Sequence, residues 1–462
     1  MSQSIATQWM LDRFEQFGPA DAILSEKKSW SYTRFLAEIK LIQESFDHSG
    51  IRPGDVVILQ CADYSHAALA SLWALWSIGA IAFPLTTNQS RLLSYSVSIA
   101  DAKWICKIHD PGDHIEIKPV EFKDPAPDAA INKLNIIRNS AHAGLILLTS
   151  GTTALPRLVL HDVARLLERF SRQRRPARTL AFMMFDHMGG IDTVCHTLSS
   201  GGALVLPESG ERSPASVAAL IDRFQIQLLP TSPTFLNHLL FSEMSEKYTL
   251  QSLEKISFGT EPMPPATLKK LTEKFPSIRI LQSYGTTELG VPGIRTKIND
   301  PAWIQFHSDT NEMKIVDGML FLRSKSAMVG YLNAPDPFDA EGWYPTGDLV
   351  EFDETGAFFR VLGRSSDIIN VGGEKVSAAT VEEVIRQAEN IRNVLVSGEK
   401  NPLIGQMIVA KIELIEPEKP LDLARRLREH CQNRLARYQI PSRFEVVDQL
   451  EQTHSGKLKR IS

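Results

Sequence analysis

Cysteine is scarce in this sequence, with 4 residues among 462. Cys61, Cys106, Cys195 and Cys431 form no CxxC pair, and their wide separation excludes the usual spacing of a metal-ligand cluster. We therefore expect reduced and mostly buried thiols, as in a cytoplasmic protein.

The sequence also has no long apolar run. None reaches the roughly 18 apolar residues of a membrane-spanning helix. The nearest, Ala67–Leu85, contains Gly79 and Pro84, so we expect a buried helix that runs into a strand. The start, MSQSIATQWMLDRFEQFG, lacks the basic and then apolar layout of a signal peptide and is typical of an amphipathic helix. These absences predict a cytoplasmic protein without a membrane span.

An excess of positive charge is absent too. The formal net charge is −4, and 43% hydrophobic and 23% charged residues are ordinary for a globular protein. A nucleic-acid partner would favour a basic balance, so we expect none. A chain of 462 residues is too long for one hydrophobic core and indicates two or three domains.

Short apolar segments that end in Gly, Ser, Thr or Pro recur along most of the chain. Examples are GDVVILQ, AGLILLTS, RTLAFMMF, GALVLP, IQLLPTS and SIRILQSYG. Helical patterns such as SPASVAALIDRFQ (Ser213–Gln225) lie between some of them. This alternation predicts an α/β fold with largely parallel sheets and with functional loops at the carboxyl ends of the strands.

The pattern changes near residue 303. EMKIVDGMLFLRS and DLVEFDETGAFFRVLG are typical of β-hairpins with Asp/Gly turns and indicate a small β-barrel-like part. A compact α+β segment follows GRSSD (Gly363–Asp367), with helices expected at Val376–Asn390 and Leu421–Tyr438. We therefore predict a large N-terminal domain over residues 1–363 and a small, mobile C-terminal domain over residues 364–462.

One segment looks like a phosphate-binding loop. In LLTSGTTALPRLVLH (Leu147–His161), Thr149–Thr153 offers hydroxyls and successive backbone N–H groups that can enclose an anion. Arg157 can add charge-assisted hydrogen bonds to a phosphate. No GK[ST] triplet closes the segment, so a kinase-type P-loop is disfavoured. Taken alone, a plain surface turn is the more frequent explanation.

A second candidate segment is LQSYGTTELG (Leu281–Gly290), which again follows a strand. Tyr284 offers a flat face for a base, and Gly285 permits close backbone approach. Thr287 and Glu288 place a hydroxyl beside a carboxylate, which suits phosphate plus Mg²⁺. The simpler alternative is a helix N-cap with these residues in the first turn.

Two more candidates stand near the end of the chain. In GWYPTGDLVEF (Gly342–Phe352), Asp348 can accept hydrogen bonds from a vicinal diol such as ribose, although an ordinary hairpin turn has the same composition. In THSGKLKRIS, Lys457 follows a Ser-Gly turn, although a lysine in such a tail is usually just solvated.

The four candidate segments, taken together and in this order, resemble the adenylate-forming superfamily. The segment RVLGRSSDIINVGGEKV (Arg360–Val376), which lies between the Asp348 segment and the Lys457 segment, adds to this resemblance. The superfamily comprises acyl- and aryl-CoA ligases, nonribosomal peptide synthetase adenylation domains and luciferases. The resemblance covers essentially the whole chain, including GIRPGDVVILQ, GAIAFPL and LPTSPTFLNHLL (Leu229–Leu240). It implies an enzyme that makes an acyl-adenylate from a carboxylic acid, ATP and Mg²⁺, releases pyrophosphate, and passes the acyl group to a nucleophile.

The resemblance implies roles in phosphate and magnesium binding. Thr287 would bind the α-phosphate, and Glu288 would bind Mg²⁺. Lys457 would bridge the carboxylate and the α-phosphate, which lowers the cost of bringing two negative charges together. The β- and γ-phosphates would be held by the loop residues Thr149, Ser150, Gly151, Thr152 and Thr153, together with Arg157.

It also implies a nucleoside site. Tyr284 would stack on adenine, with Gly285 beside it. Asp348 would bind the ribose, and Arg364 would lie near the same ribose. The other face of adenine would be covered by the backbone of Gly259, Thr260 and Glu261.

The chain departs from the family pattern in two places. The phosphate loop has Ala154, Arg157 and Leu158 where Gly, Lys and Gly are usual, which predicts a slower or differently paced adenylation or a more rigid loop. The family pivots its small domain at an Asp or Lys, which corresponds here to Ser366, so the pivot is Ser366 or Asp367. Pivoting would bring the face Asn370–Lys375, with Gly372 and Gly373, towards the acyl site; a tight turn explains these glycines as well.

The acyl pocket is expected along Phe185–Thr193, Ser232–Phe235 and Glu288–Ile294. His187 resembles the aromatic or histidine gate of acyl- and aryl-CoA ligases. Asp186 resembles the ammonium-binding residue of amino-acid-activating domains, but the HMGG context favours the alignment with ligases. A core or loop role for Asp186 has the same weight as either. The apolar segments of the expected acyl pocket indicate that the substrate is an aromatic, alicyclic or medium-chain acid.

The acceptor is left open. The first expectation is a thiol, either CoA or a carrier pantetheine. The second is an amino acid amine, as in coronafacate–amino acid ligases. A third hypothesis, a nucleotide-binding protein without catalysis, is disfavoured because Lys457, Glu288 and Asp348 are all present.

Overall fold

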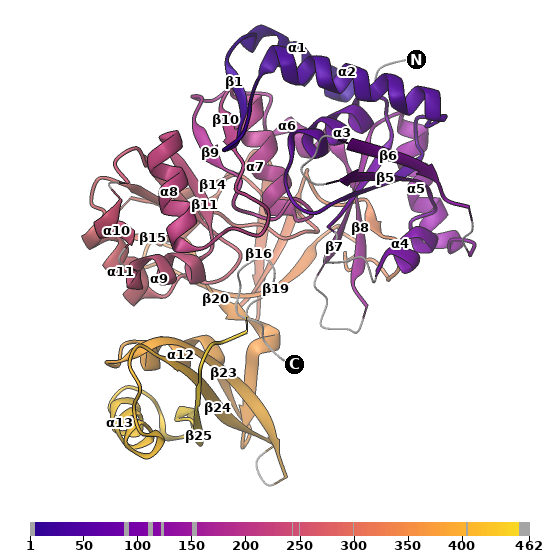
Figure 1. The fold of residues 1–462 in the computed structure, drawn as a ribbon. Helices are drawn as coiled ribbons and strands as arrows, with labels where there is room; N and C mark the ends of the chain where they lie inside the picture. Colours follow the sequence, from indigo (N-terminus) through magenta and orange to yellow (C-terminus); the bar gives the residue numbers. More distant parts are fainter. Residues whose placement is uncertain are drawn as a thin grey trace.

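A computed structural model describes residues 5–86, 92–109, 114–121, 124–149, 155–242, 244–248, 250–298, 300–402 and 405–451. Over these ranges the chain forms four sheets with helices packed against them (Figure 1). All four cysteines are free and buried, as predicted. Within the same ranges, no helix is long and apolar enough to cross a bilayer.

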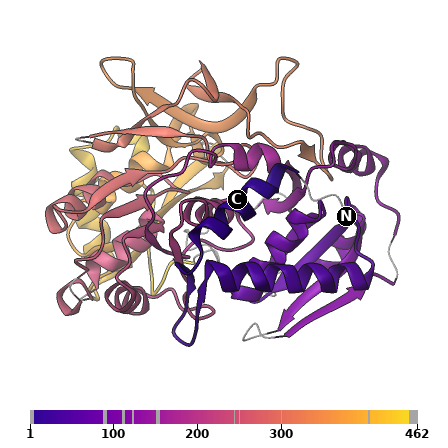
Figure 2. The same ribbon diagram turned by 90° about the horizontal axis from the view of Figure 1, so that it is seen from above.

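The first sheet has the order β18-β8-β7-β4-β3-β5-β6. Helices cover both faces of its parallel centre and form a separate hydrophobic core on each, and the segment Ala67–Leu85 is the predicted buried helix and strand. The strands are β3 (Val56–Cys61), β4 (Ile81–Thr86), β5 (Ala102–His109), β6 (His114–Pro119), β7 (Gly144–Thr149), β8 (Arg157–Asp162) and β18 (Gly330–Tyr331). The helices are α1 (Ile5–Phe17), α2 (Tyr32–Ser49), α3 (His66–Ser77), α4 (Leu93–Ile99) and α5 (Asp128–Ser140). Figures 1 and 2 show α1 and α2, in indigo, at one surface of the large unit.

The second sheet has the order β13-β12-β11-β9-β10-β1-β2 and is parallel except for β2. Its strands are β1 (Asp21–Leu24), β2 (Ser29–Ser31), β9 (Arg178–Leu180), β10 (Ala203–Val205), β11 (Leu228–Thr231), β12 (Lys255–Phe258) and β13 (Arg279–Gln282). Its helices are α7 (Met188–Ser199), α8 (Pro214–Phe224), α9 (Pro233–Phe241), α10 (Met244–Lys247) and α11 (Pro265–Lys274), whereas α6 (Val163–Glu168) follows β8 and packs in a core of the first sheet. Of RTLAFMMF, only the first three residues form a strand, because the chain then turns into α7.

The third sheet is antiparallel, in the order β14-β15-β20-β19-β17-β16. It forms the expected hairpins: Asp317 and Gly318 join β16 to β17 with φ of 50° and 77°, as a two-residue turn requires. The strands are β14 (Ile294–Lys297), β15 (Asp300–Phe306), β16 (Asn311–Val316), β17 (Met319–Ser324), β19 (Tyr344–Phe352) and β20 (Phe359–Arg364).

The C-terminal part has its own sheet and its own hydrophobic core, and lies below the rest in Figure 1. After the 3-10 turn Ser365–Asp367 come β21 (Ile368–Val371), β22 (Glu374–Ser377), α12 (Ala378–Arg386), β23 (Ile391–Asn401), β24 (Gly405–Leu414), α13 (Pro420–Gln432) and β25 (Arg443–Val447). The predicted α/β fold with a large and a small part is confirmed. The boundary at residues 363 and 364 stays a prediction.

Two predicted helices are too long. The expected helix Val376–Asn390 is α12, which spans only Ala378–Arg386. The expected helix Leu421–Tyr438 is α13, which ends at Gln432. Leu423, Leu427 and Cys431 form its buried stripe, after which the backbone N–H groups of Arg434 and Leu435 both bond to the Cys431 carbonyl and tighten the chain into a turn.

Candidate active site

The phosphate-loop segment joins two antiparallel neighbours. Thr149, the last residue of β7, lies opposite Arg157, the first residue of β8. A kinase-type P-loop instead connects a strand to a helix, so this arrangement agrees with its exclusion. Ser150, Gly151, Thr152, Thr153 and Ala154 lie outside the described residues, and their phosphate contacts stay predictions.

The exit from this segment is fixed by one asparagine. Asn333 Oδ1 accepts from the Leu158 N–H at 2.8 Å, and Asn333 Nδ2 donates to the Pro156 carbonyl at 2.9 Å. The Leu158 side chain is fully buried and lies opposite Leu148. Arg157, in contrast, is exposed. Two of the three departures in the phosphate loop therefore have different surroundings: Leu158 lies in the core, and Arg157 lies in solvent.

The second candidate segment forms a closed turn after β13. The Thr286 N–H donates to the Gly290 carbonyl at 3.1 Å, and the Leu289 N–H donates to Thr286 Oγ1 at 3.1 Å. A Cβ on Gly285 would lie 2.6 Å from the Gly290 carbonyl oxygen, so only glycine fits this position. The alternative of a helix N-cap is wrong, because no helix follows.

This turn holds Glu288 inside the protein. The side chain is buried, and Oε1 accepts a hydrogen bond from the Tyr331 hydroxyl at 2.7 Å. Tyr344 interacts with the same carboxylate; its burial and the charge of Glu288 raise the pKa of Tyr344. Arg157 Nη1 donates to the Tyr331 hydroxyl at 3.4 Å.

A magnesium ion fits Glu288. Among the described residues, no three His, Cys, Asp or Glu side chains gather as a metal cage. Mg²⁺ bound with nucleotides usually takes only one or two carboxylates and completes its shell with phosphate oxygens and water. A single ionisable carboxylate, held by neutral hydroxyl donors, matches that requirement.

Asp348 is the second buried carboxylate of the site. Tyr284 donates its hydroxyl to Oδ2 at 2.6 Å, and Arg364 Nε lies 2.8 Å from Oδ1. Burial, together with the Asp348 charge, raises the pKa of Tyr284 well above its usual value, so the phenol remains a donor. A carboxylate offers about four lone-pair sites, so Asp348 can accept hydrogen bonds from several donors at once.

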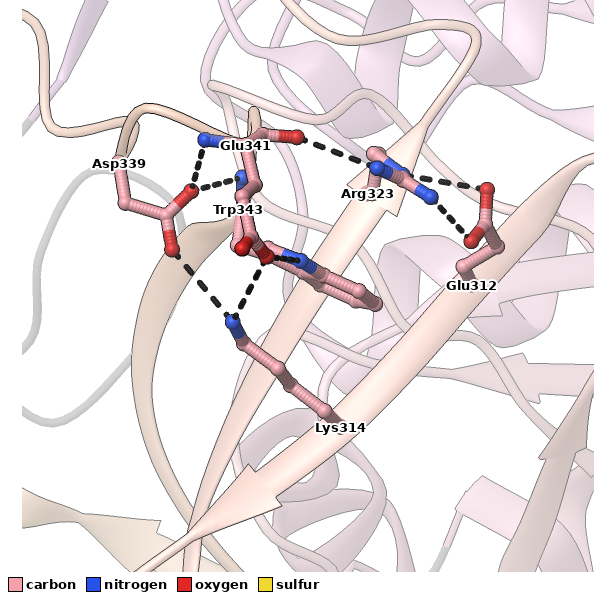
Figure 3. A network of polar contacts seen from close by, with 6 residues as sticks. All are labelled: Glu312, Lys314, Arg323, Asp339, Glu341 and Trp343. Atoms are coloured by element: carbon pink, nitrogen blue, oxygen red, sulfur yellow. Dashed lines mark hydrogen bonds and ion pairs between the residues drawn. The ribbon is translucent and has the colours of Figure 1, made fainter.

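The loop that leads into β19 is anchored by charged side chains (Figure 3). Asp339 accepts from the backbone N–H groups of Glu341 and Trp343 at 3.0 Å and 2.9 Å. Lys314 lies 4.6 Å and Arg323 5.0 Å from the centre of the Trp343 ring. These contacts fix the start of the strand that carries Tyr344 and Asp348.

The residues predicted to cover adenine lie after β12. A Cβ on Gly259 would lie 2.8 Å from the Ser283 carbonyl, so the two segments approach closely there. Thr260 has a φ of 75°, which is uncommon for a non-glycine residue. Glu261 Oε1 accepts from the Thr234 N–H at 2.7 Å, at the start of α9. The adenine contact itself stays a prediction.

On the predicted acyl side, Asp186 is almost fully buried. Its carboxylate bonds to His187 Nδ1 at 2.7 Å and to the hydroxyl of Thr86 at 2.8 Å. Burial opposes ionisation, but these hydrogen bonds outweigh it and lower the pKa of Asp186. Asp186 thus ties the end of β4 to the start of α7, and His187 stays half-exposed beside it.

The structure brings five of the predicted residues into two connected chains of contacts. One runs from Arg157 through Tyr331 to Glu288, and the other runs from Tyr284 through Asp348 to Arg364. Tyr284 and Glu288 share one turn, which joins the two chains. Lys457 lies outside the described residues.

Sequence reasoning missed three residues, Tyr331, Tyr344 and His161. Tyr331 and Glu288 are 43 residues apart, and His161, which bonds to the Thr287 carbonyl, is 126 residues from Thr287. No local pattern marks such partners. The available signals were that His161 is the last residue of the phosphate-loop segment and that Tyr344 lies in the candidate segment Gly342–Phe352.

Comparison with known proteins gives two matching family models. Residues 11–332 match "AMP-binding enzyme", and residues 380–457 match "AMP-binding enzyme C-terminal domain". The chain is 25% identical over 481 residues to a 2-succinylbenzoate–CoA ligase of Listeria monocytogenes serotype 4b (strain F2365), covering 98% of both chains. It is 26% identical over 343 residues to a medium-chain fatty-acid–CoA ligase of Escherichia coli (strain K12), covering 68% of this chain and 60% of that protein.

Solved structures share the fold. An anthranilate CoA ligase in complex with anthranoyl-AMP has a TM-score of 0.83 at 20% identity and covers 97% of this chain and 95% of that one. The amide bond synthetase McbA from Marinactinospora thermotolerans has a TM-score of 0.77 at 20% identity and covers 98% of each chain. The predictions of an adenylate-forming fold and of an ATP-dependent, AMP-forming ligase are confirmed. With both models matched in order, the first over more than half of the length, the chain belongs to the AMP-binding enzyme family.

Proposed function

We propose that the enzyme activates a carboxylic acid as its acyl-adenylate and transfers the acyl group to a thiol, either CoA or a carrier pantetheine. The observation that supports this most is the pair of connected chains around the Glu288 turn. They place candidate phosphate, magnesium and ribose ligands on adjoining segments. The CoA ligases among the curated relatives support the thiol acceptor.

In the first step, an oxygen of the acid attacks the α-phosphorus of ATP, and the bond to pyrophosphate breaks. Arg157 and the loop from Thr149 to Thr153 bind the departing phosphates, and Thr287 binds the α-phosphate. A Mg²⁺ ion at Glu288 would neutralise phosphate charge when bound. Lys457 holds the two reacting anions together.

In the second step, the thiol sulfur attacks the acyl carbon, the bond to the phosphate oxygen breaks, and AMP leaves. Asp348 and Arg364 hold the ribose throughout. His187, which precedes α7 and bonds to Asp186, is the proposed gate of the acyl pocket. The acid is an aromatic, alicyclic or medium-chain one, and the four buried thiols suit a reducing cytoplasm.

The experiment that tests the acceptor measures product mass. The enzyme is incubated with ATP, Mg²⁺ and a panel of carboxylic acids, first scored by pyrophosphate release, and then with CoA or mixed amino acids. We expect a thioester with CoA. An adduct found only with amino acids would replace this proposal by an amide-forming ligase, and the absence of any acid-dependent pyrophosphate release would indicate a binding protein.

Lys457 has a separate test. Lys457→Ala is expected to abolish acid-dependent pyrophosphate release and to spare the reaction of a preformed acyl-adenylate with the acceptor, because the lysine acts only in the first step. Both half-reactions are followed in single-turnover assays. Pyrophosphate release at the full rate would show that another cation bridges the reacting anions.

A further inference from the structure

The Glu288 turn is held from one side by the two strands next to the phosphate loop. β18 pairs with β8, with Gly330 opposite Leu160 and Tyr331 opposite Val159. From these strands and the segment before them come two contacts to the turn's backbone. His161 Nε2 bonds to the Thr287 carbonyl at 2.6 Å, and the Met328 N–H donates to the Glu288 carbonyl at 2.7 Å.

His161 acts on this turn as a neutral donor. The side chain is fully buried, and burial lowers its pKa to about 4, so the imidazole carries one proton at neutral pH. A carbonyl only accepts, so that proton resides on Nε2. Nδ1 is a buried atom with no hydrogen-bond partner among the described residues. The histidine is therefore specialised for a single hydrogen bond, to Thr287.

Tyr331 acts on the side chain of the same turn. It is 1% exposed, and its hydroxyl lies 2.7 Å from Glu288 Oε1, which as a carboxylate oxygen accepts the phenol proton. Its hydroxyl gives its proton to Glu288 and accepts from Arg157, whose guanidinium carbon lies 5.1 Å from the ring centre. A planar guanidinium can lie over a ring and donate to its hydroxyl, which suits Arg better than Lys here.

We propose that Tyr331 and His161 are positioning residues for nucleotide binding: Tyr331 orients the Glu288 carboxylate towards Mg²⁺, and His161 fixes the backbone of Thr287 against the strand of the phosphate loop. This inference rests on the proposed function of Glu288 and Thr287. In this proposal, Tyr331 links the position of Arg157, on the phosphate side of the site, to the orientation of Glu288, on the magnesium side.

The first test uses Tyr331→Phe, which keeps the ring and removes only the hydroxyl. The control is Tyr32→Phe, because the Tyr32 hydroxyl is also buried and bonded, to the Gly202 carbonyl at 2.6 Å, but lies outside the site. ATP binding is measured by titration calorimetry at a series of Mg²⁺ concentrations without acid.

Tyr331→Phe is expected to raise the Mg²⁺ concentration needed for half-maximal binding roughly tenfold, the usual effect of losing one hydrogen bond to a charged group. Tyr32→Phe is expected to leave it unchanged. Equal Mg²⁺ dependence in the two variants would overturn the role of Tyr331.

A double-mutant cycle separates this inference from the proposed function. If Tyr331 acts through Glu288, adding Tyr331→Phe to Glu288→Gln changes the Mg²⁺ dependence no further. Effects that multiply would overturn the positioning role. If Glu288→Gln alone leaves the Mg²⁺ dependence unchanged, the proposed magnesium site itself is wrong.

His161 is tested by rescue. His161→Gln places an amide N–H where Nε2–H lies, whereas His161→Leu fills the space without a donor. We expect His161→Leu to lower kcat for pyrophosphate release roughly tenfold with little change in KM for the acid, and His161→Gln to recover most of that loss. Equal kcat in the two variants would overturn the donor role, whatever their thermal stability.

Discussion

At the scale of single residues, two neighbouring glycines of α7 have very different surroundings. A Cβ on Gly190 would lie 2.0 Å from the Met184 carbonyl oxygen and 2.6 Å from the Tyr64 hydroxyl. A Cβ on Gly189 would meet only the end of the flexible Met183 side chain, at 3.2 Å. The first glycine is required by packing against backbone, and the second is not.

Gly190→Ala is therefore expected to lower the free energy of unfolding by about 2 kcal/mol or more, since overpacking outweighs the better helix propensity of alanine. Gly189→Ala should change it by less than about 1 kcal/mol. Urea unfolding followed by circular dichroism measures both. A tolerated Gly190→Ala would mean that the start of α7 shifts easily.

The buried histidine His161 predicts a pH dependence of stability. Its pKa is about 4 in the folded chain and near 6.5 when unfolded, so between these values the unfolded chain binds more protons. The free energy of unfolding then falls as pH falls through this window, by about 2 kcal/mol from this residue between about pH 7 and pH 5. His161→Gln should flatten the urea-unfolding profile by that amount, and an unchanged slope would show that His161 does not contribute.

At the scale of elements, the β7–β8 hairpin places two residues that differ from the family's phosphate-loop pattern, Arg157 and Leu158, in different environments. Leu158 is a core residue, so Leu158→Gly, which restores the usual family residue, is expected to cost about 3 kcal/mol or more of stability. Arg157→Lys, at an exposed position, should change stability by less than about 0.5 kcal/mol but alter pyrophosphate release. Thermal unfolding and single-turnover kinetics check the pair. A neutral Leu158→Gly would contradict the packing argument.

Some turns and helix ends could be predicted from the sequence, and others could not. The Asp317-Gly318 turn was readable because its two residues have the backbone preferences that a tight hairpin needs. The end of α13 was not, since Leu435 continues the apolar spacing although the chain has already turned at Cys431. The roles expected for Glu288 and Asp348 came from a family pattern, whereas Tyr331 and His161 lie on other strands and become neighbours only in the folded chain.

At the scale of the whole molecule, a buried asparagine joins the two parts. Asn237 on α9 donates from Nδ2 to the Arg392 carbonyl on β23 at 2.9 Å, while its Oδ1 accepts from Thr267 on α11 at 3.2 Å. The amide nitrogen of Asn237 thus bonds to the C-terminal part, while its amide oxygen is held by the large part.

Asn237→Ala is expected to loosen this contact and to speed tryptic cleavage at Arg364 about threefold to tenfold, in line with the loss of about 1 kcal/mol from one hydrogen bond. The control is Thr272→Ala, since the Thr272 hydroxyl bonds only within α11. Cleavage is followed by gel electrophoresis and mass spectrometry without ATP. Equal rates in the two variants would show that Asn237 does not hold the parts together.

The four buried cysteines have a practical consequence for measuring movement of the C-terminal part relative to the large part. Burial raises the pKa of every one of these thiols, to about 12 for Cys106 and about 11 for Cys431, so in the folded chain each is both shielded and protonated. Maleimide dyes react with exposed thiolates. One surface cysteine added to each part of the otherwise native protein would therefore accept a donor and an acceptor fluorophore, and energy transfer between them would test turnover by turnover the predicted movement of the C-terminal part.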